Sequence, residues 1–405
     1  MIECSKYKLS ECCLSISDGD HLPPPKVDAG IPFITISDID SSNRLNLDVK
    51  QFVPEEYYNN LKDIRKAQRN DILYSVVGSF GIPVIIKGND KFVFQRHIAI
   101  LRPDPTKVIP DYLFYIMKSY NFYMQADSVA IGAAQRTISL TALRNMTVEL
   151  PSIDVQRKIA TTLSRYDSLI DNYQKQIRLL EEAAQRLYKE WFVNLRFPGH
   201  ENTKIVDGVP EGWEKKKISD ICDTIGGGTP STKEASYYEG GTIKWVTPTD
   251  ITKNKGLCLL DTDKKITEEG LKHSSAKMLP AGTILMTSRA SVGYFGIADF
   301  EVCTNQGFIS CIPSSKYYQM YLLRNLMNRI EEIRIKAGGS TYLEISKSVF
   351  RNLDIICPSD KILQKFQARA NAYYMQEKNL SIQLRLLAES CDRLLPKLLS
   401  GEIEV

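Results

Sequence analysis

The sequence predicts an α+β protein in which two repeated α/β domains are separated by a pair of long antiparallel helices that form a coiled coil. Three observations predict this architecture. Apolar residues recur with heptad spacing along two long segments. The second segment repeats the first 207 positions later without a gap. Short β-like runs broken by turns precede each segment. The chain is therefore a tandem duplication of one module.

The two heptad segments match residue by residue, and the same offset extends upstream to Gly132 and Gly339. The first seam comprises Ile159, Leu163, Tyr166, Ile170, Tyr173, Ile177, Leu180, Ala184, Leu187 and Trp191, and the second comprises Phe366, Ala370, Tyr373, Glu377, Leu380, Leu384, Leu387, Cys391, Leu394 and Leu398. Glu377 stands where the first seam has Ile170. It is either a polar residue that sets the helix register or a position at which the helices splay.

The boundaries follow from stop signals and the duplication. We expect domain 1 at 1–150, the first long helix at 151–193, a polar connector at 194–212, domain 2 at 213–357, and the second long helix with a C-terminal tail at 358–405. Pro151 and Pro358 each precede a short polar residue and an acidic first turn, which is typical of a helix start. The first helix should reach about Phe192, a length of roughly 58 Å. Pro396 and Gly401 should close the second.

The partner of each seam has two interpretations. If the seams pack on each other within one chain, the helices are antiparallel, and a shared chain gives them a high effective concentration. Alternatively, each seam pairs with another protein. In domain 1 the clearest predicted strands are 31–36, 71–77, 83–86 and 92–94, and residues 111–124 are expected to form a helix. Domain 2 retraces this course with changed loop lengths.

Composition sets broad limits on function. The 405 residues are 43% hydrophobic and 25% charged, as in ordinary globular proteins, and the net charge of +4 permits a nucleic-acid partner without requiring one. Nine cysteines form no C-x-x-C pair and four histidines are far apart, so buried free thiols fit better than a metal site. With no signal-peptide core at the N-terminus and no long apolar run, we expect a cytoplasmic protein that does not enter a membrane.

No catalytic motif stands out along the chain. Gly226-Gly227-Gly228-Thr229-Pro230 is glycine-rich but lacks the Lys-Ser/Thr ending of a P-loop and the spacing of a dinucleotide fingerprint. The Asn-Pro-Pro-aromatic tetrad of amino-methyltransferases is missing, and no Ser, His and acidic residues form a recognisable triad pattern. Two domains held apart by a rigid spacer therefore suggest recognition, not catalysis.

Several motifs resemble the target recognition domains of specificity subunits from type I restriction-modification systems. In domain 1 they are Gly19-Asp20-His21-Leu22-Pro23-Pro24-Pro25-Lys26 and Gly30-Ile31-Pro32-Phe33-Ile34. In domain 2 they are Val209-Pro210-Glu211-Gly212-Trp213, Gly228-Thr229-Pro230-Ser231, Thr287-Ser288-Arg289-Ala290-Ser291-Val292-Gly293 and Cys303-Thr304-Asn305-Gln306-Gly307-Phe308. The resemblance spans nearly the whole chain, although domain 1 has no Pro-x-Gly-Trp entry.

The resemblance implies a non-catalytic subunit that reads a bipartite, asymmetric site on double-stranded DNA. Each domain would read one half-site, and the helices would fix the gap. It also implies assembly with two methyltransferase subunits and two restriction-translocase subunits. S-adenosylmethionine, ATP and Mg²⁺ would then belong to those partners, and this chain would hold no cofactor or metal.

Polar loop residues that could reach bases or phosphates are the candidate DNA contacts. In domain 1 they are Asp20, His21, Lys26, Gln95, Arg96, His97, Gln135 and Arg136; in domain 2 they are Thr229, Ser231, Lys233, Ser288, Arg289, Thr304, Asn305, Gln306, Thr341 and Tyr342. Arg289 could bind guanine bidentately, or form only a surface salt bridge. Asn305 and Gln306 suit adenine but could equally cap a turn. His21 could hold its own loop, and Tyr342 could be a core residue.

Two other classes of function compete with DNA recognition. A duplicated coiled-coil scaffold would use its globular ends to bind protein, and exposed apolar patches there would favour it. A self-contained enzyme is disfavoured by the missing motifs. The basic and amide-rich loops favour DNA.

Overall fold

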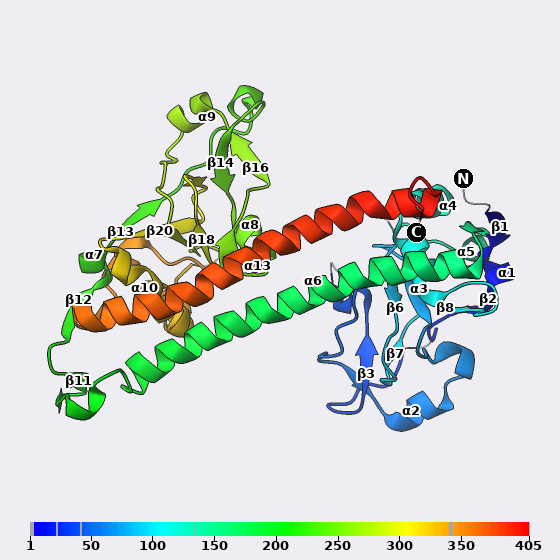
Figure 1. Cartoon of the computed structure of the whole chain (residues 1–405), viewed down its shortest axis with the longest axis horizontal. Coiled ribbons are helices and arrows are strands. Elements are labelled where there is room, and N and C mark those ends of the chain that lie inside the picture. The colour runs from blue at the N-terminus through cyan, green and yellow to red at the C-terminus, as the bar shows by residue number, and fades with distance from the viewer. Residues whose placement is uncertain (1–3, 22, 41–42, 134, 340–342, 405) are drawn as a thin grey trace. The chain divides into compact units, whose positions relative to one another are not determined.

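The computed structural model describes residues 4–21, 23–40, 43–133, 135–339 and 343–404. The chain divides into two compact units, Met1–Leu169 with Ala388–Val405 (unit 1) and Ile170–Leu387 (unit 2). Unit 1 contains domain 1, unit 2 contains domain 2, and both long helices contribute to each unit (Figure 1). The predicted α+β class and repeated domains are confirmed.

Domain 1 is built on two small sheets. The first is antiparallel with the order β2-β8-β5-β6, and the second has the order β4-β3-β7, in which β3 and β7 are parallel. Their strands are β2 (Cys13–Asp18), β3 (Ile31–Ile34), β4 (Phe52–Val53), β5 (Ile72–Ser75), β6 (Pro83–Ile85), β7 (Val93–Phe94) and β8 (Ile98–Pro103), while β1 (Ser5–Lys8) pairs with β9 (Thr147–Leu150). The α-helices are α1 (Leu9–Cys12), α2 (Glu55–Asn60), α3 (Pro110–Lys118), α4 (Tyr120–Val129) and α5 (Leu140–Asn145).

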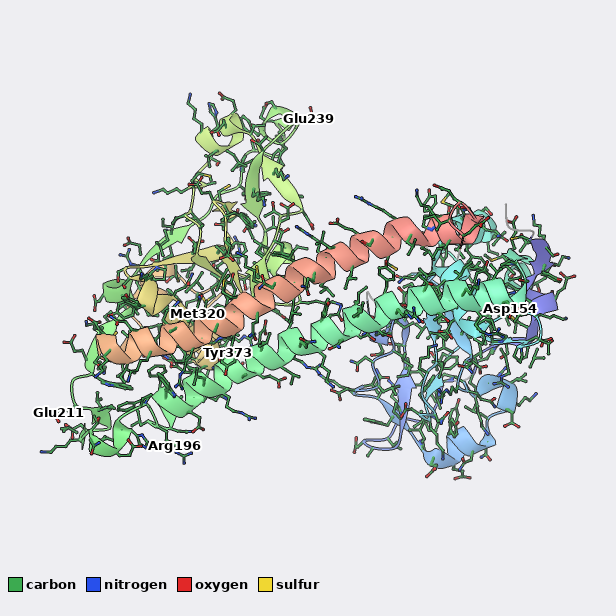
Figure 2. All side chains as sticks on the ribbon, in the orientation of Figure 1. Asp154, Arg196, Glu211, Glu239, Met320 and Tyr373 are labelled. Atoms are coloured by element: carbon green, nitrogen blue, oxygen red, sulfur yellow. The ribbon has the colours of Figure 1, made fainter. Side chains whose placement is uncertain are left out.

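Domain 2 repeats this order of elements with one added strand and one added α-helix. Its larger sheet has the order β13-β20-β17-β18-β15 and its smaller sheet the order β16-β14-β19. The strands are β12 (Glu214–Lys217), β13 (Cys222–Gly226), β14 (Ile243–Val246), β15 (Cys258–Leu259), β16 (Lys264–Ile266), β17 (Thr283–Thr287), β18 (Phe295–Ala298), β19 (Cys303–Thr304), β20 (Phe308–Pro313) and β21 (Asp354–Cys357). The helices are α7 (Ile218–Ile221), α8 (Pro248–Lys253), α9 (Glu268–Lys272), α10 (Gln319–Asn328), α11 (Ile330–Lys336) and α12 (Lys347–Arg351). The small sheet and α9 form an outer lobe, with Glu239 at its tip (Figures 1 and 2).

Both domains use the same glycine contact where the first large-sheet strand ends. A Cβ at Gly19 would lie 2.6 Å from the Gln95 carbonyl oxygen, and a Cβ at Gly227 would overlap the carbonyl oxygens of Thr304 and Asn305. Only glycine lets the backbone approach the end of the small-sheet strand this closely. The glycine-rich run of domain 2 is therefore explained in part by packing.

The two long helices run antiparallel within each unit. The first is α6 (Ile153–Tyr188), which continues into a π turn at Lys189–Val193, and the second is α13 (Asp360–Ser400). In unit 1, Ile159 and Leu163 share a core with Cys391 and Leu398. In unit 2, the Trp191 and Phe366 ring centroids are 5.8 Å apart. Pairing of the two seams within one chain is therefore confirmed.

Three details differ from the prediction. Pro396 lies inside α13, which continues until Gly401 adopts a φ of 74°, because packing of Leu398 in the unit 1 core outweighs the lost backbone hydrogen bond. The helix expected at 111–124 is two helices, since Ser119 is extended and caps α4 by accepting from the Phe122 amide. The predicted strands are also one to three residues too long.

Glu377 has a third role that neither expectation included. Its side chain is 1% exposed and accepts hydrogen bonds from the Leu257 amide and, at 3.3 Å, from the Cys258 amide. The carboxylate therefore holds the start of β15 against α13. A Cβ at Gly256 would lie 2.7 Å from the Glu377 Oε1 atom, so glycine makes room for this contact.

A cluster of three buried or half-buried charged residues lies between α10 of domain 2 and both long helices. Arg324 is 1% exposed, and Glu181 of α6 and Glu377 of α13 both act on its guanidinium electrostatically. Burial raises the pKa of Glu181 to about 7, and the neighbouring Glu377 carboxylate adds to the shift while Arg324 opposes it. Burial also raises the pKa of Glu377, while the Leu257 and Cys258 amides and Arg324 oppose that shift. The two carboxyl groups therefore titrate as a pair beside one arginine.

Hydrogen bonds attach domain 1 to α6, one to a carboxylate and another between two neutral groups. Tyr115 of α3 donates to the Asp167 carboxylate at 2.6 Å. Gln156 accepts from the Ile109 amide at 2.9 Å, at the start of α3. In domain 2 a glutamine about one turn further along its helix, Gln367, makes a similar contact and accepts from the Met320 amide at 3.0 Å. Met320 is labelled beside α13 in Figure 2.

All nine cysteines are free thiols, and seven of them are buried, as the sequence indicated. No helix within the described ranges is long and apolar enough to cross a membrane.

Candidate functional site

Three loops meet at the same place in each domain, which we call the strand-end edge. In domain 1 it comprises residues 76–78 after β5, 95–97 after β7, and 135–139 before α5; in domain 2 it comprises 288–290 after β17, 305–307 after β19, and 343–346 before α12. Backbone hydrogen bonds fix both edges alike. The Val76 amide donates to the His97 carbonyl at 2.9 Å, and the Ser288 amide donates to the Gly307 carbonyl at 2.8 Å.

The third loop is joined to the first in the same way in both domains. The Gly78 amide donates to the Arg136 carbonyl at 2.9 Å, and the Ala290 amide donates to the Leu343 carbonyl at 2.8 Å. Gly78 and Ala290 both have a positive φ, of 71° and 61°. A left-handed residue is required at this turn, and alanine accepts it at a cost of about 1 kcal/mol. The equivalence of the two edges thus rests on the backbone.

Side chains predicted as DNA contacts line two adjoining hollows at the domain 1 edge. One, of about 360 Å³, includes Arg96, His97 and Gln135 in its wall. The other, of about 270 Å³, includes Gln95, His97 and Gln135. Arg96 and Gln135 are exposed and the other two are half-buried. These four residues from two separate loops form one polar surface, as a base-contacting site requires.

The remaining candidates in domain 1 mainly contact their own domain. Asp20 accepts a hydrogen bond from the Tyr57 hydroxyl and pairs with Arg65 at 2.7 Å, while burial and this carboxylate raise the pKa of Tyr57. His21 contacts Asp18 at 2.9 Å. Lys26 is exposed on its loop.

Arg136 also forms contacts within its domain. It pairs with Asp127 at the end of α4 and lies over the Phe80 ring at 5.2 Å. Asp20, His21 and Arg136 therefore have structural contacts, and their predicted DNA roles stay predictions.

At the domain 2 edge several polar side chains already have partners, either side chains or the backbone. The Thr229 hydroxyl donates to the Gln306 amide oxygen, and the Asn305 side chain accepts from the Gly307 amide at 2.9 Å. Arg289 lies 3.7 Å from the Glu344 carboxylate. These pairs hold the candidate groups in defined positions.

The other candidates in domain 2 divide into exposed and buried residues. Ser231 and Lys233 are exposed on the loop that leads to the outer lobe. Ser288 is 3% exposed and Thr304 is 1% exposed, so both side chains lie beneath the edge. Within the described ranges the Thr304 hydroxyl has no hydrogen-bond partner. Thr341 and Tyr342 lie outside the described residues.

Two charged residues at the domain 2 edge were missed from the sequence. Glu344 pairs with Arg289. The Lys347 ammonium lies close to Gly226, at 3.2 Å from the position that an added Cβ would occupy. The signal was available in the duplication, because the offset of 207 aligns them with the uncharged Thr137 and Leu140. No group of three or more His, Cys, Asp and Glu side chains that could hold a metal was found in the described part of the chain.

Comparison with known proteins identifies the repeated domain. Residues 13–182 and 210–388 each match the family described as the type I restriction modification DNA specificity domain. The type I restriction enzyme MjaIX specificity subunit of Methanocaldococcus jannaschii is 29% identical over 311 residues, covering 74% of this chain and 70% of the relative. The HindI specificity subunit of Haemophilus influenzae is 25% identical over 417 residues, covering 85% and 90%.

The fold also matches a solved structure. The crystal structure of the type I restriction-modification S subunit from M. genitalium superposes with a TM-score of 0.61 at 15% identity, covering 98% of this chain and 96% of that one. This likeness concerns the fold alone. Because the family match covers both repeats, the chain belongs to the family of type I restriction-modification DNA specificity subunits.

Proposed function

We propose that this chain directs a type I restriction-modification complex to a bipartite, asymmetric DNA target, with each domain reading one half-site through its strand-end edge. One observation carries the proposal. The two edges share a backbone frame, yet Val77 and Arg96 of domain 1 are replaced by Arg289 and Gln306 in domain 2. At these aligned positions the guanidinium group thus stands on a different loop in each copy. Reading two different half-sites needs this combination of a constant frame and changed polar groups.

The paired helices would hold the two half-sites apart, and the chain would supply recognition without catalysis. Methyl transfer and DNA cleavage would reside on two methyltransferase and two restriction-translocase subunits, which would bind S-adenosylmethionine, ATP and Mg²⁺. The names of the relatives, which are specificity subunits of type I restriction enzymes, support this assignment. A protein-binding scaffold is not favoured, because both repeats match a DNA specificity domain.

Methylome sequencing tests the proposal. The gene is expressed with its matching methyltransferase subunit, as the wild type and as the Arg96→Ala and Arg289→Ala variants. We expect a new bipartite methylated motif in the wild type. Arg96→Ala should relax or abolish one half and Arg289→Ala the other, because each guanidinium contacts one half-site. The two variants are matched controls for each other. An assembled complex that methylates no bipartite motif would refute the proposal.

A further inference from the structure

Arg289 and Glu344 place hydrogen-bond donors beside an acceptor at the domain 2 edge. Their side chains are 47% and 48% exposed, and the Arg289 Nε atom is 3.7 Å from the Glu344 Oε2 atom. The two residues face each other across an isolated antiparallel bridge. Both side chains therefore emerge from neighbouring backbone positions and are accessible to a ligand at the edge.

This ion pair is not needed to hold the loop in place. Backbone bonds already do so: Glu344 and Gly338 exchange two hydrogen bonds of 2.8 and 3.0 Å, and the Ile345 amide donates to the Ser288 carbonyl at 3.0 Å. A half-exposed ion pair adds at most about 1 kcal/mol of stability. The side chains are thus available for recognition, and their substitution should leave the fold intact.

Phosphates repel a carboxylate on a DNA-binding edge, and a hydrogen bond from a donor on the DNA offsets that repulsion. In the major groove, guanine presents two acceptors, O6 and N7, and its partner cytosine presents the N4 amino donor. An arginine with an adjacent glutamate matches that pattern group by group. An A·T pair instead places the adenine amino donor where the arginine requires an acceptor, so one of the groups is left unpaired.

We propose that Arg289 and Glu344 together read one G·C base pair in the half-site bound by domain 2, and that Glu344 is a specificity-determining residue. This inference rests on the proposed function. The equivalent positions in domain 1 are the uncharged Val77 and Thr137, which occupy the same kind of bridge. Val77 and Thr137 therefore do not select a G·C pair at the corresponding position of the half-site bound by domain 1.

The test compares methylated motifs from complexes that contain wild-type chain, Glu344→Gln or Glu211→Gln. Glu211 is exposed in the connector before β12 and provides the matched control (Figure 2). The half-site of domain 2 is the half altered by Arg289→Ala. We expect it to contain an invariant G·C pair in the wild type. In Glu344→Gln, other base pairs at that position should be methylated about 10-fold or more above the wild-type level, while the remaining positions and the other half stay unchanged.

A binding measurement covers the case in which Glu344→Gln abolishes methylation altogether. Affinity of the assembled complex is measured by fluorescence anisotropy for duplexes that carry G·C or A·T at the assigned position. The wild type should prefer G·C by about 10-fold or more, and Glu344→Gln should lose most of that preference. A half-site without an invariant G·C pair, or an unchanged preference in the variant, would overturn the inference while leaving the proposed function intact. A wild-type complex without any bipartite motif would instead refute the proposed function.

Discussion

The two domains of this chain share the same backbone contacts, but different side chains attach them to the long helices. Gly19 and Gly227 allow the same close approach at a strand end, and Ser139 and Ser346 cap α5 and α12 in the same way. At the attachment, however, Tyr115 of domain 1 aligns with Arg324 of domain 2. Backbone geometry was thus retained through duplication, whereas buried polar contacts were replaced.

The attachments differ in how much charge is buried. Domain 1 relies on a hydrogen bond from Tyr115 to Asp167, whereas domain 2 buries Arg324 and Glu377, with the half-buried Glu181 near them. Removing a carboxylate near the buried Arg324 leaves its charge less compensated, which is costlier than losing one hydrogen bond. The attachment of domain 2 should therefore be the more sensitive to single substitutions.

The largest effect is expected from removing Glu377. Glu377→Ala leaves two backbone amides and part of the Arg324 charge without a partner, so the free energy of unfolding of unit 2 should fall by about 3–5 kcal/mol. Tyr115→Phe in domain 1 should cost about 1 kcal/mol. Peptide-resolved hydrogen exchange assigns each loss to its unit. Equal losses from the two variants would contradict the difference between the attachments.

The shared glycine contact gives an intermediate effect that should be equal in both copies. Gly19→Ala and Gly227→Ala each force a Cβ against carbonyl oxygens, which should destabilise the corresponding domain by about 3 kcal/mol. Gly338→Ala is the control, because no atom of the described residues lies within 4 Å of its added Cβ. Thermal denaturation of the three variants measures the effect. If only one copy were sensitive, the equivalence of the two frames would be wrong.

A smaller, pH-dependent effect should be confined to unit 2. Because folding raises the pKa of Glu181 to about 7, the folded state retains a proton that the unfolded chain has lost. The free energy of unfolding should therefore fall as the pH rises from about 4.5 to about 7. Glu181→Gln cannot ionise and should show a smaller fall, because only Glu377 then keeps a raised pKa. At pH 8 it should exceed the wild type by about 2 kcal/mol.

Glu182→Gln is the control for this pH dependence. Glu182 is the next residue along α6, and its side chain is 63% exposed. Denaturant unfolding at pH 5 and pH 8 compares the two variants with the wild type. A similar pH dependence in wild type and Glu181→Gln would show that Glu181 does not hold the proton.

Periodicity and repetition predicted the architecture but could not predict buried polar partners. The steps of three and four residues located both helices, and the high effective concentration of two matched seams in one chain favoured their pairing with each other over pairing with another protein. They also assigned Glu377 to the helix pair, although its carboxylate serves the start of β15. Heptad spacing reports which side of a helix a residue occupies. It does not report which loop, distant in the sequence, reaches that side.

The sequence by itself determined the duplication, the helices and the loops that form the strand-end edges, because these depend on local patterns that recur at a fixed offset. Only the tertiary structure decided which polar residues face one another there. It brought Gln95 and His97 beside Gln135, paired Arg289 with Glu344, and placed Ser288 and Thr304 beneath the edge. The physical reason is that these neighbours are fixed by strand pairing between distant segments, and a single-residue change of register would reverse which side chains are exposed.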